Sequence, residues 1–238
     1  MHNWKARVHG YEAATKVFQQ LEEKAPEWGK YTPLIKKFVT DSNAVAQEKG
    51  LEAALAYVEN AASAVKTAQD VLNGIVAKCL GSARAKTKDL GMQIILMYVE
   101  IEKYEVVQET LVGALSSQKN PKVVAACVAT LSRILYEFGL KVINVKALLK
   151  AVPSILEDRD KNVREEGKVL MIELYRWIGQ ALKPQLSNLK PIQVSELEAE
   201  FDKIGHEKPV QVRFLRSQQD LKAKFEAKAA GIEDGDGM

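Results

Sequence analysis

The side chains of this 238-residue chain that are suited to binding chemistry are basic residues in short polar segments. Lysine and arginine there offer charged hydrogen-bond donors to carboxylates and other anions. Taken singly, such residues are usually solvated charges at helix starts, and neighbouring aspartates temper their field. Their repetition at equivalent positions indicates a binding surface instead. These residues are Lys5, Arg7, Arg84, Lys86, Lys88, Lys119, Lys122, Arg159, Lys161 and Arg164.

The polar segments recur about every 40 residues. They read Trp4-Lys5-Ala6-Arg7, Asn43-Ala44-Val45-Ala46, Arg84-Ala85-Lys86-Thr87, Asn120-Pro121-Lys122-Val123 and Asp160-Lys161-Asn162-Val163. We align the segments on Ala6, Ala46, Thr87, Val123 and Val163. Four positions after each aligned residue stands a small side chain, at Gly10, Gly50, Gly91, Cys127 and Gly167. A period of this length with two helices per unit is typical of an α-solenoid of HEAT repeats, whose equivalent loops share one edge. We therefore expect an all-α fold and a binding surface along that edge.

Helical periodicity supports this fold. Val124, Cys127, Val128 and Leu131 form an apolar stripe over successive turns, and similar stripes begin at Leu51 and Val163. No alternating strand pattern of useful length occurs. The partner helices are expected near Tyr31–Val39, Ala62–Leu80, Tyr104–Ser116 and Val145–Leu156. Glycine disfavours a helix interior, so its recurrence predicts close approach of neighbouring helices.

The polar segments also carry helix-start chemistry. Asn120 precedes a proline at the first helical position, where the missing N–H costs nothing. Asp160 and either Ser42 or Asn43 are expected to cap their helices in the same way. The unpaired N–H groups and positive dipole ends of these helices then lie on the loop edge, where they favour anions.

Composition and motifs exclude several classes of protein. No apolar run approaches the length of about 18 residues that a membrane span needs. Cys79 and Cys127 are far apart in apolar patterns and are expected to be buried. No cysteine–histidine cluster has zinc spacing, and no phosphate-binding glycine loop or nucleophile motif is present. We expect no enzyme activity, no metal and no cofactor.

The net charge of +3 mildly favours an acidic partner. A nucleic-acid-binding solenoid would need aromatic side chains interleaved with the basic segments, and only Trp4 meets that need. An importin-like peptide adaptor would repeat an apolar or Asn/Trp-lined ladder, which is absent. We therefore expect a protein partner, no nucleic acid, no membrane and a monomeric domain.

Trp4 stands out among the aromatic residues because of its place in the repeat. It occupies a polar-segment position whose side chain is expected to face outward. Two interpretations remain open: a terminal aromatic tucked into the fold, or an exposed anchor that fills a pocket on a partner. Trp28 and Trp177 lie within or beside apolar stripes and are expected to pack in the core.

Longer stretches of the sequence carry a family resemblance. They are Trp4–Glu12, Pro26–Trp28, Leu34–Ala44, Lys49–Leu55, Met97–Lys103, Asn120–Lys122, Val163–Arg164, Tyr175–Ile178 and Arg213–Gln219. Together they resemble the first TOG domain of the Minispindles-type animal microtubule polymerases, over nearly the whole chain. The resemblance implies a flat paddle of about six HEAT repeats whose loop edge binds the αβ-tubulin heterodimer in its curved, soluble form. In the full-length protein, such a domain contributes to plus-end polymerisation in the cytoplasm, at the spindle and at the centrosome.

The resemblance also implies which residues meet tubulin. In the family the first and second loops contact β-tubulin, and basic residues of later loops reach α-tubulin. Arg164 has a second interpretation, a structural pairing with a nearby Asp. The implied tubulin-binding residues are Trp4, Lys5, Ser42, Asn43, Val45, Lys86, Asn120, Lys122, Lys161 and Arg164.

Domain limits follow from the same comparison. Residues 1–204 are expected to form the TOG domain, with a truncated first repeat because relatives continue upstream of the tryptophan. Residues 205–238 are expected to form an extension. Arg213–Ala229 is expected either to fold as a helix or to begin a linker to a second TOG domain, and Gly231–Gly237 to be disordered.

The sequence leaves two alternative functions open. A CLASP-like TOG domain would promote rescue or pausing of microtubules, and a generic HEAT scaffold would bind another acidic protein. The second-loop run Ser42–Val45 and the run Arg213–Gln219 favour the polymerase family.

Overall fold

Helices make up the regular structure of the protein in a computed structural model that describes residues 3–205 and 207–230. Within these residues no strand occurs, and none of the helices is long and apolar enough to cross a membrane. The α-helices are α1 (Trp4–Phe18), α2 (Trp28–Tyr31), α3 (Ile35–Val39), α4 (Ala44–Asn60), α5 (Ala68–Lys78), α6 (Ala85–Glu100), α7 (Tyr104–Ser117), α8 (Pro121–Phe138), α9 (Val145–Leu156), α10 (Lys161–Ile178), α11 (Pro191–Phe201) and α12 (Arg216–Ala229). The 3₁₀ helices are η1 (Thr32–Leu34), η2 (Ala62–Lys66), η3 (Leu140–Val142) and η4 (Gly179–Asn188).

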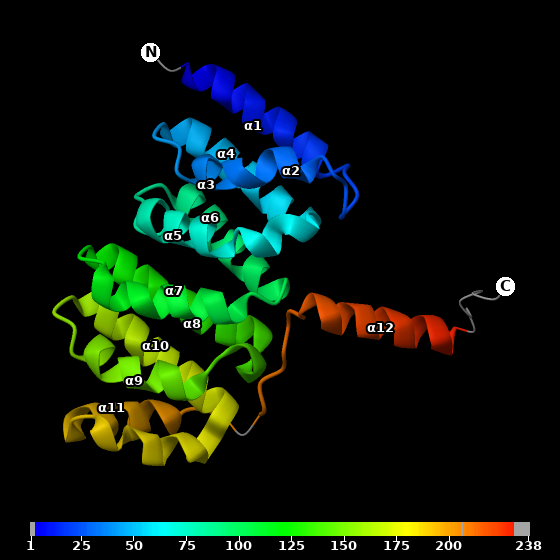
Figure 1. The fold of residues 1–238 in the computed structure, drawn as a ribbon. Coiled ribbons are helices and arrows are strands. Elements are labelled where there is room, and N and C mark those ends of the chain that lie inside the picture. The colour runs from blue at the N-terminus through cyan, green and yellow to red at the C-terminus, as the bar shows by residue number, and fades with distance from the viewer. Residues whose placement is uncertain (1–2, 206, 231–238) are drawn as a thin grey trace.

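The helices stack in two layers that extend from α1 at one end of the molecule to α11 at the other (Figure 1). Inner helices α1, α4, α6, α8, α10 and α11 pack on one another in that order, and outer helices α3, α5, α7 and α9 form the second layer. Helix α1 is thus followed by the hairpins α3–α4, α5–α6, α7–α8, α9–α10 and η4–α11. This arrangement confirms the predicted all-α solenoid of HEAT repeats.

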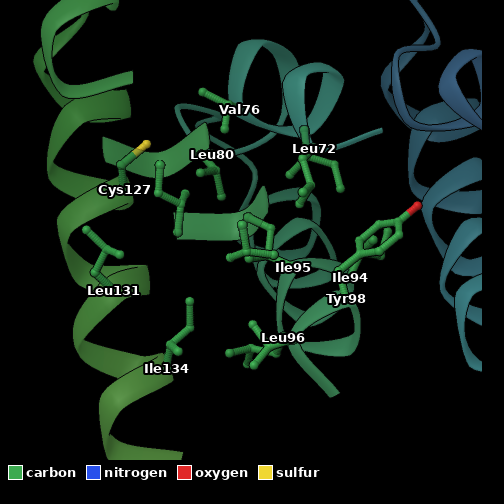
Figure 2. Packing of buried hydrophobic residues seen from close by; sticks show 14 of the residues in the cluster. Leu72, Val76, Leu80, Ile94, Ile95, Leu96, Tyr98, Cys127, Leu131 and Ile134 are labelled. Carbon is green, nitrogen blue, oxygen red and sulfur yellow. The ribbon is translucent and has the colours of Figure 1, made fainter. Parts of the chain in front are cut away.

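One continuous apolar core runs between the layers. Figure 2 shows Cys127, Leu131 and Ile134 of α8 facing apolar side chains of α6 and of the turn after α5, among them Ile95 and Leu80. These side chains are at most 1% exposed. Both cysteines are free and buried, and burial raises the pKa of each thiol to about 12. They act as small apolar core residues, as their sequence positions predicted.

The recurring glycines mark close contacts between inner and outer helices, with one exception. A methyl group added at Gly50 would collide with the backbone carbonyl of Phe38, and one at Gly167 would lie 2.6 Å from Cγ2 of Ile155. A methyl at Gly91 would lie 3.0 Å from Cβ of Cys79. At Gly10 nothing lies within 4 Å, so the prediction of a close contact is wrong there. Within the described residues, no helix covers that face of α1.

The internal tryptophans are packing residues, as predicted. Trp28 is 2% exposed, donates from Nε1 to the carbonyl of Glu22 at 2.8 Å, and packs with the ring of Phe18. Trp177 is half-buried, and its Nε1 donates to Glu173 at 3.1 Å.

The chain beyond the last hairpin turns back along the molecule. From the end of α11 it climbs to the middle of the stack on the side opposite the polar loops, and α12 then projects outward (Figure 1). Within Arg213–Ala229, a helix forms over Arg216–Ala229. The disorder expected for Gly231–Gly237 concerns residues outside those that the structure describes.

We expect Gly50→Ala and Gly10→Ala to change stability in opposite directions. The methyl group at position 50 collides with backbone that has no room to move, so the free energy of unfolding should fall by about 1–3 kcal/mol. The methyl group at position 10 meets open space in a helix interior, so it should stabilise the protein by about 0.5–1 kcal/mol. Urea unfolding of both variants measures the two changes, and an unaffected Gly50→Ala protein would contradict the packing described above.

Candidate functional site

The polar segments predicted to form one edge do so. The loops that precede the inner helices α4, α6, α8 and α10 lie on the same side of the stack, with the start of α1 above them (Figure 1). The predicted caps are present: Asn43 accepts from the amides of Val45 and Ala46, and Asn120 accepts from Lys122. We call this row the loop edge. It comprises Asn3–Arg7, Asp41–Ala46, Ser82–Thr87, Lys119–Val123 and Asp158–Arg164.

A buried carboxylate joins the first two segments of the loop edge. Asp41, whose side chain is 3% exposed, receives Nε and Nη2 of Arg7 at 2.7 and 2.8 Å. The same carboxylate accepts from the Tyr11 hydroxyl at 2.8 Å and from the Asn43 amide at 2.9 Å. The hydrogen bonds from Arg7 lower the pKa of Asp41 to about 2. Burial and the contact with Asp41 raise the pKa of Tyr11. Helix α1 is therefore fastened to the second loop.

The side chains carried by these two segments face outward. Trp4 at the start of α1 is 37% exposed, and the Lys5 ammonium lies 5.8 Å from its ring centroid. Val45 is 44% exposed and Ser42 is exposed, whereas the Asn43 side chain is occupied in capping α4. Trp4 is thus an exposed aromatic residue rather than one tucked into the fold. It presents an apolar surface next to a positive charge.

The third segment holds its cations in ion pairs. Lys86 pairs with Glu52 at 2.7 Å, and Glu52 also receives Lys49 at 3.1 Å. Arg84 pairs with Glu48 at 2.6 Å, and this hydrogen bond lowers the pKa of Glu48. The cations therefore bridge α4 and α6 while remaining half-exposed, so the positive potential here is weaker than the sequence suggested.

The fourth and fifth segments present lysines without such partners. Lys122 at the start of α8 and Lys161 at the start of α10 are exposed. Among residues 3–205 and 207–230, neither forms an ion pair. Each stands next to a helix N-terminus. At α8 the cap is the neutral Asn120, so charge and helix dipole act in the same direction, whereas at α10 the Asp160 carboxylate offsets part of the dipole. This half of the edge is suited to carboxylates of a partner.

Arg164 braces its own loop. Its Nη1 donates to the carbonyls of Asp158 and Arg159 at 2.7 and 2.9 Å. The expected partner was an Asp side chain, but the acceptors are backbone oxygens, because the loop turns its carbonyls toward the helix. Arg7 and Gln47 occupy the same register. Arg7 donates to Asp41 of the second loop, and Gln47 donates to the carbonyl of Val39, the last residue of α3, at 2.9 Å.

Sequence reasoning therefore missed a set of positioning residues. Asp41 and Gln47 were not singled out, and Arg7 was counted among the free cations. A signal was present in the sequence. In three of the five units, the residue directly after the aligned position has a long side chain that bonds to the adjoining loop or helix end: Arg7, Gln47 and Arg164.

The chain is similar in sequence to a known protein family and to several of its members. The family model described as XMAP215/Dis1/CLASP, TOG domain, matches residues 1–201. The chain is 55% identical to Protein mini spindles of Drosophila melanogaster over 97% of its length and 11% of that protein. It is 35% identical to the spindle pole body component alp14 of Schizosaccharomyces pombe over 91% of its length and 27% of that protein. The chain thus spans between a tenth and about a quarter of these relatives.

Solved structures share the fold. One described as "Structural Basis of Tubulin Recruitment and Assembly by Microtubule Polymerases with Tumor Overexpressed Gene (TOG) Domain Arrays" superposes with a TM-score of 0.83 at 29% identity. It covers 94% of this chain and 49% of that one. The Drosophila melanogaster Mini spindles TOG3 structure superposes with a TM-score of 0.79 at 24% identity, over 90% of this chain and 94% of that one. The second likeness shows the fold alone.

We expect Asp41→Asn to lower the free energy of unfolding by roughly 1–2 kcal/mol at pH 7, because the paired carboxylate is lost from a buried position. The folded-state pKa of Asp41 lies below its usual value, so its contribution is complete above about pH 5 and fades as the pH falls toward about 2. Urea unfolding of both proteins at several pH values should show the difference narrowing in acid. A difference that stays constant with pH would contradict the assigned role of Asp41.

Proposed function

The chain belongs to the XMAP215/Dis1/CLASP family of TOG domains, and we propose that its loop edge binds the αβ-tubulin heterodimer. The observation that carries the proposal is the composition of this edge. An exposed tryptophan stands at one end and exposed lysines beside capped helix ends stand at the other, on a single rigid solenoid. The solved structure at 29% identity, whose description names tubulin recruitment by TOG domain arrays, supports the same partner.

We assign the contacts by segment. Trp4, with Lys5, is the anchor at the β-tubulin end, and Ser42, Asn43 and Val45 extend that contact. Lys86, Asn120, Lys122 and Lys161 face the α-tubulin end. Arg164 holds the fifth loop in shape, and its bonds to two loop carbonyls support a positioning role beside any direct contact.

The arrangement supports a preference for curved, soluble tubulin. A solenoid fixes the distance between the Trp4 end and the Lys161 end, and the two tubulin subunits change their relative orientation between the curved and straight forms. A ligand shifts such an equilibrium only by its differential affinity for the two forms. A stiff edge that matches one form provides that difference. In a longer protein, the domain would deliver dimers to microtubule plus ends.

Sequence similarity favours the polymerase branch of the family over the CLASP branch. Identity to Protein mini spindles is 55%, against 24% over 71% of the chain to the CLIP-associating protein of Drosophila melanogaster. Relatives described as a spindle pole body component and a centrosomal protein support a location at the spindle and centrosome. The proposed activity is binding, without catalysis or a cofactor.

We expect Trp4→Glu to weaken tubulin binding by about 30-fold or more, as substitution of a hot-spot tryptophan commonly costs 2 kcal/mol or more. The measurement is co-elution with soluble αβ-tubulin in gel filtration, followed by titration. Lys146→Ala, an exposed lysine on outer helix α9, is the matched control and should bind like the unchanged protein. Helicity measured by circular dichroism confirms that each variant is folded. Equal binding by Trp4→Glu would remove Trp4 from the interface.

We expect Lys122→Ala and Lys161→Ala to act mainly on the rate of association. These exposed cations attract an acidic partner over distance, and salt screens that attraction over about 10 Å at 0.1 M ionic strength. Stopped-flow association at increasing salt should show a steep decline for the unchanged protein and a shallower one for Lys122→Ala/Lys161→Ala. Equal salt dependence for the two proteins would mean that these lysines do not steer the encounter.

A further inference from the structure

A segment outside the repeats is fastened across several of them. Gln211–Gln219, which we call the strap, follows the climb of the chain back from α11 and lies at the edge opposite the loop edge (Figure 1). Its partners sit at the carboxyl-terminal ends of inner helices α4, α6 and α8. These three helices belong to three successive repeats.

Arg213 is the centre of the strap. Its guanidinium donates to the carboxylate of Glu137 at 3.4 Å and to that of Glu100 at 3.2 Å, and lies 5.4 Å from the ring centroid of Phe138. The carbonyl of Glu137 accepts from the amides of Val212 and Arg213 at 3.0 and 2.9 Å. The side chain is 24% exposed, and its carboxylate partners are 15% and 10% exposed. One residue thus ties the end of α6 to the end of α8.

Further bonds extend the strap to α4. Arg216 donates to the backbone carbonyl of Glu59 at 2.8 Å. Ser217 donates to Glu102 at 2.6 Å, and Gln219 donates to Glu100 at 2.6 Å. Leu215 is buried between these polar contacts.

The strap also balances charge at this edge. Glu59, Glu100, Glu102 and Glu137 lie here, and Arg133 pairs with Glu137 from within α8. Burial and then the Glu100 charge raise the pKa of Glu59, whereas Arg213 and Arg216 act in the opposite direction. The two strap arginines therefore supply positive charge to an acidic surface that would otherwise repel itself.

Repeat proteins are held together by contacts between neighbouring repeats, so small changes at each interface add up along the stack. A segment bonded to three successive repeats supplies a constraint that these pairwise interfaces lack. We propose that the strap fixes the spacing of the repeats containing α4, α6 and α8, and through these helices the spacing of the second, third and fourth segments of the loop edge. The benefit to tubulin binding rests on the function proposed above, whereas the mechanical claim does not.

The spacing is measurable by pulsed electron spin resonance between pairs of spin labels. Cys79 and Cys127 are buried, with thiol pKa values raised to about 12, so introduced cysteines can be labelled selectively. One pair, Ala44→Cys with Lys119→Cys, spans the strapped repeats. The control pair, Lys119→Cys with Arg159→Cys, spans the next interface, which the strap does not cross. All three positions are exposed.

The test compares the unchanged strap with Arg213→Ala. We expect the 44–119 distance distribution to broaden or shift, and the 119–159 distribution to stay the same. Arg216→Ala removes the bond to the Glu59 carbonyl at the end of α4 and serves as a second variant if Arg213→Ala does not fold. Unchanged 44–119 distributions in the folded variants would overturn the proposal, as would equal broadening of both pairs.

A binding measurement then links the strap to the loop edge. Arg213→Ala should bind tubulin about two- to tenfold more weakly, because binding must then order repeats that the strap no longer holds. Val152→Ala, a buried truncation in α9 outside the strapped repeats, controls for a general loss of stability and should bind normally. Absence of tubulin binding by the unchanged protein would contradict the proposed function and leave the distance result intact. Broadened distances with normal affinity would overturn the link to binding alone.

Discussion

The placement of the candidate site depends first on the Asp41 carboxylate. Helix α1 packs mainly against α4, so it lacks the support on two sides that the later inner helices have. Asp41 compensates by binding Arg7 and Tyr11 of α1 and the Asn43 amide of its own loop. The result is a fixed relation between Trp4 and the second loop. Without it, the orientation of Trp4 would rest on the packing of α1 against α4 and its neighbours alone.

The other end of the edge is organised by a different device. The later inner helices are locked by close approach to outer helices, as at Gly91 and Gly167, and their first turns are closed by Asn120 and Asp160. Lys122 and Lys161 are therefore displayed by rigid helix starts rather than by flexible loops. A surface with an anchored aromatic end and a fixed cationic end is suited to a large partner that must be engaged at both ends simultaneously. In our proposal, the strap fixes the spacing of the repeats that lie between these two ends, those containing α4, α6 and α8.

The fold and the position of the loop edge were predictable from the sequence, because the same weak pattern recurs in every repeat. The period revealed the fold, and Asn120-Pro121 and Asp160 revealed where inner helices begin, since capping is local chemistry. Pairing between repeats was not predictable in the same way. Nothing in the sequence near Lys86 indicates that Glu52 neutralises it, and nothing near Arg213 indicates that its partners are Glu100 and Glu137. These contacts depend on the superhelical geometry, which a period does not specify. The failed prediction at Gly10 has a different origin: within the described residues no outer helix packs on that face of α1.

The most direct test of the central claim is hydrogen–deuterium exchange of the protein alone and bound to soluble αβ-tubulin. Binding at the loop edge predicts slower exchange on complex formation in the first turns of α1, α4, α8 and α10, with no change at the first turns of α7 and α9 on the opposite edge. Protection that falls on the outer helices, with none at the starts of the inner helices, would contradict the account.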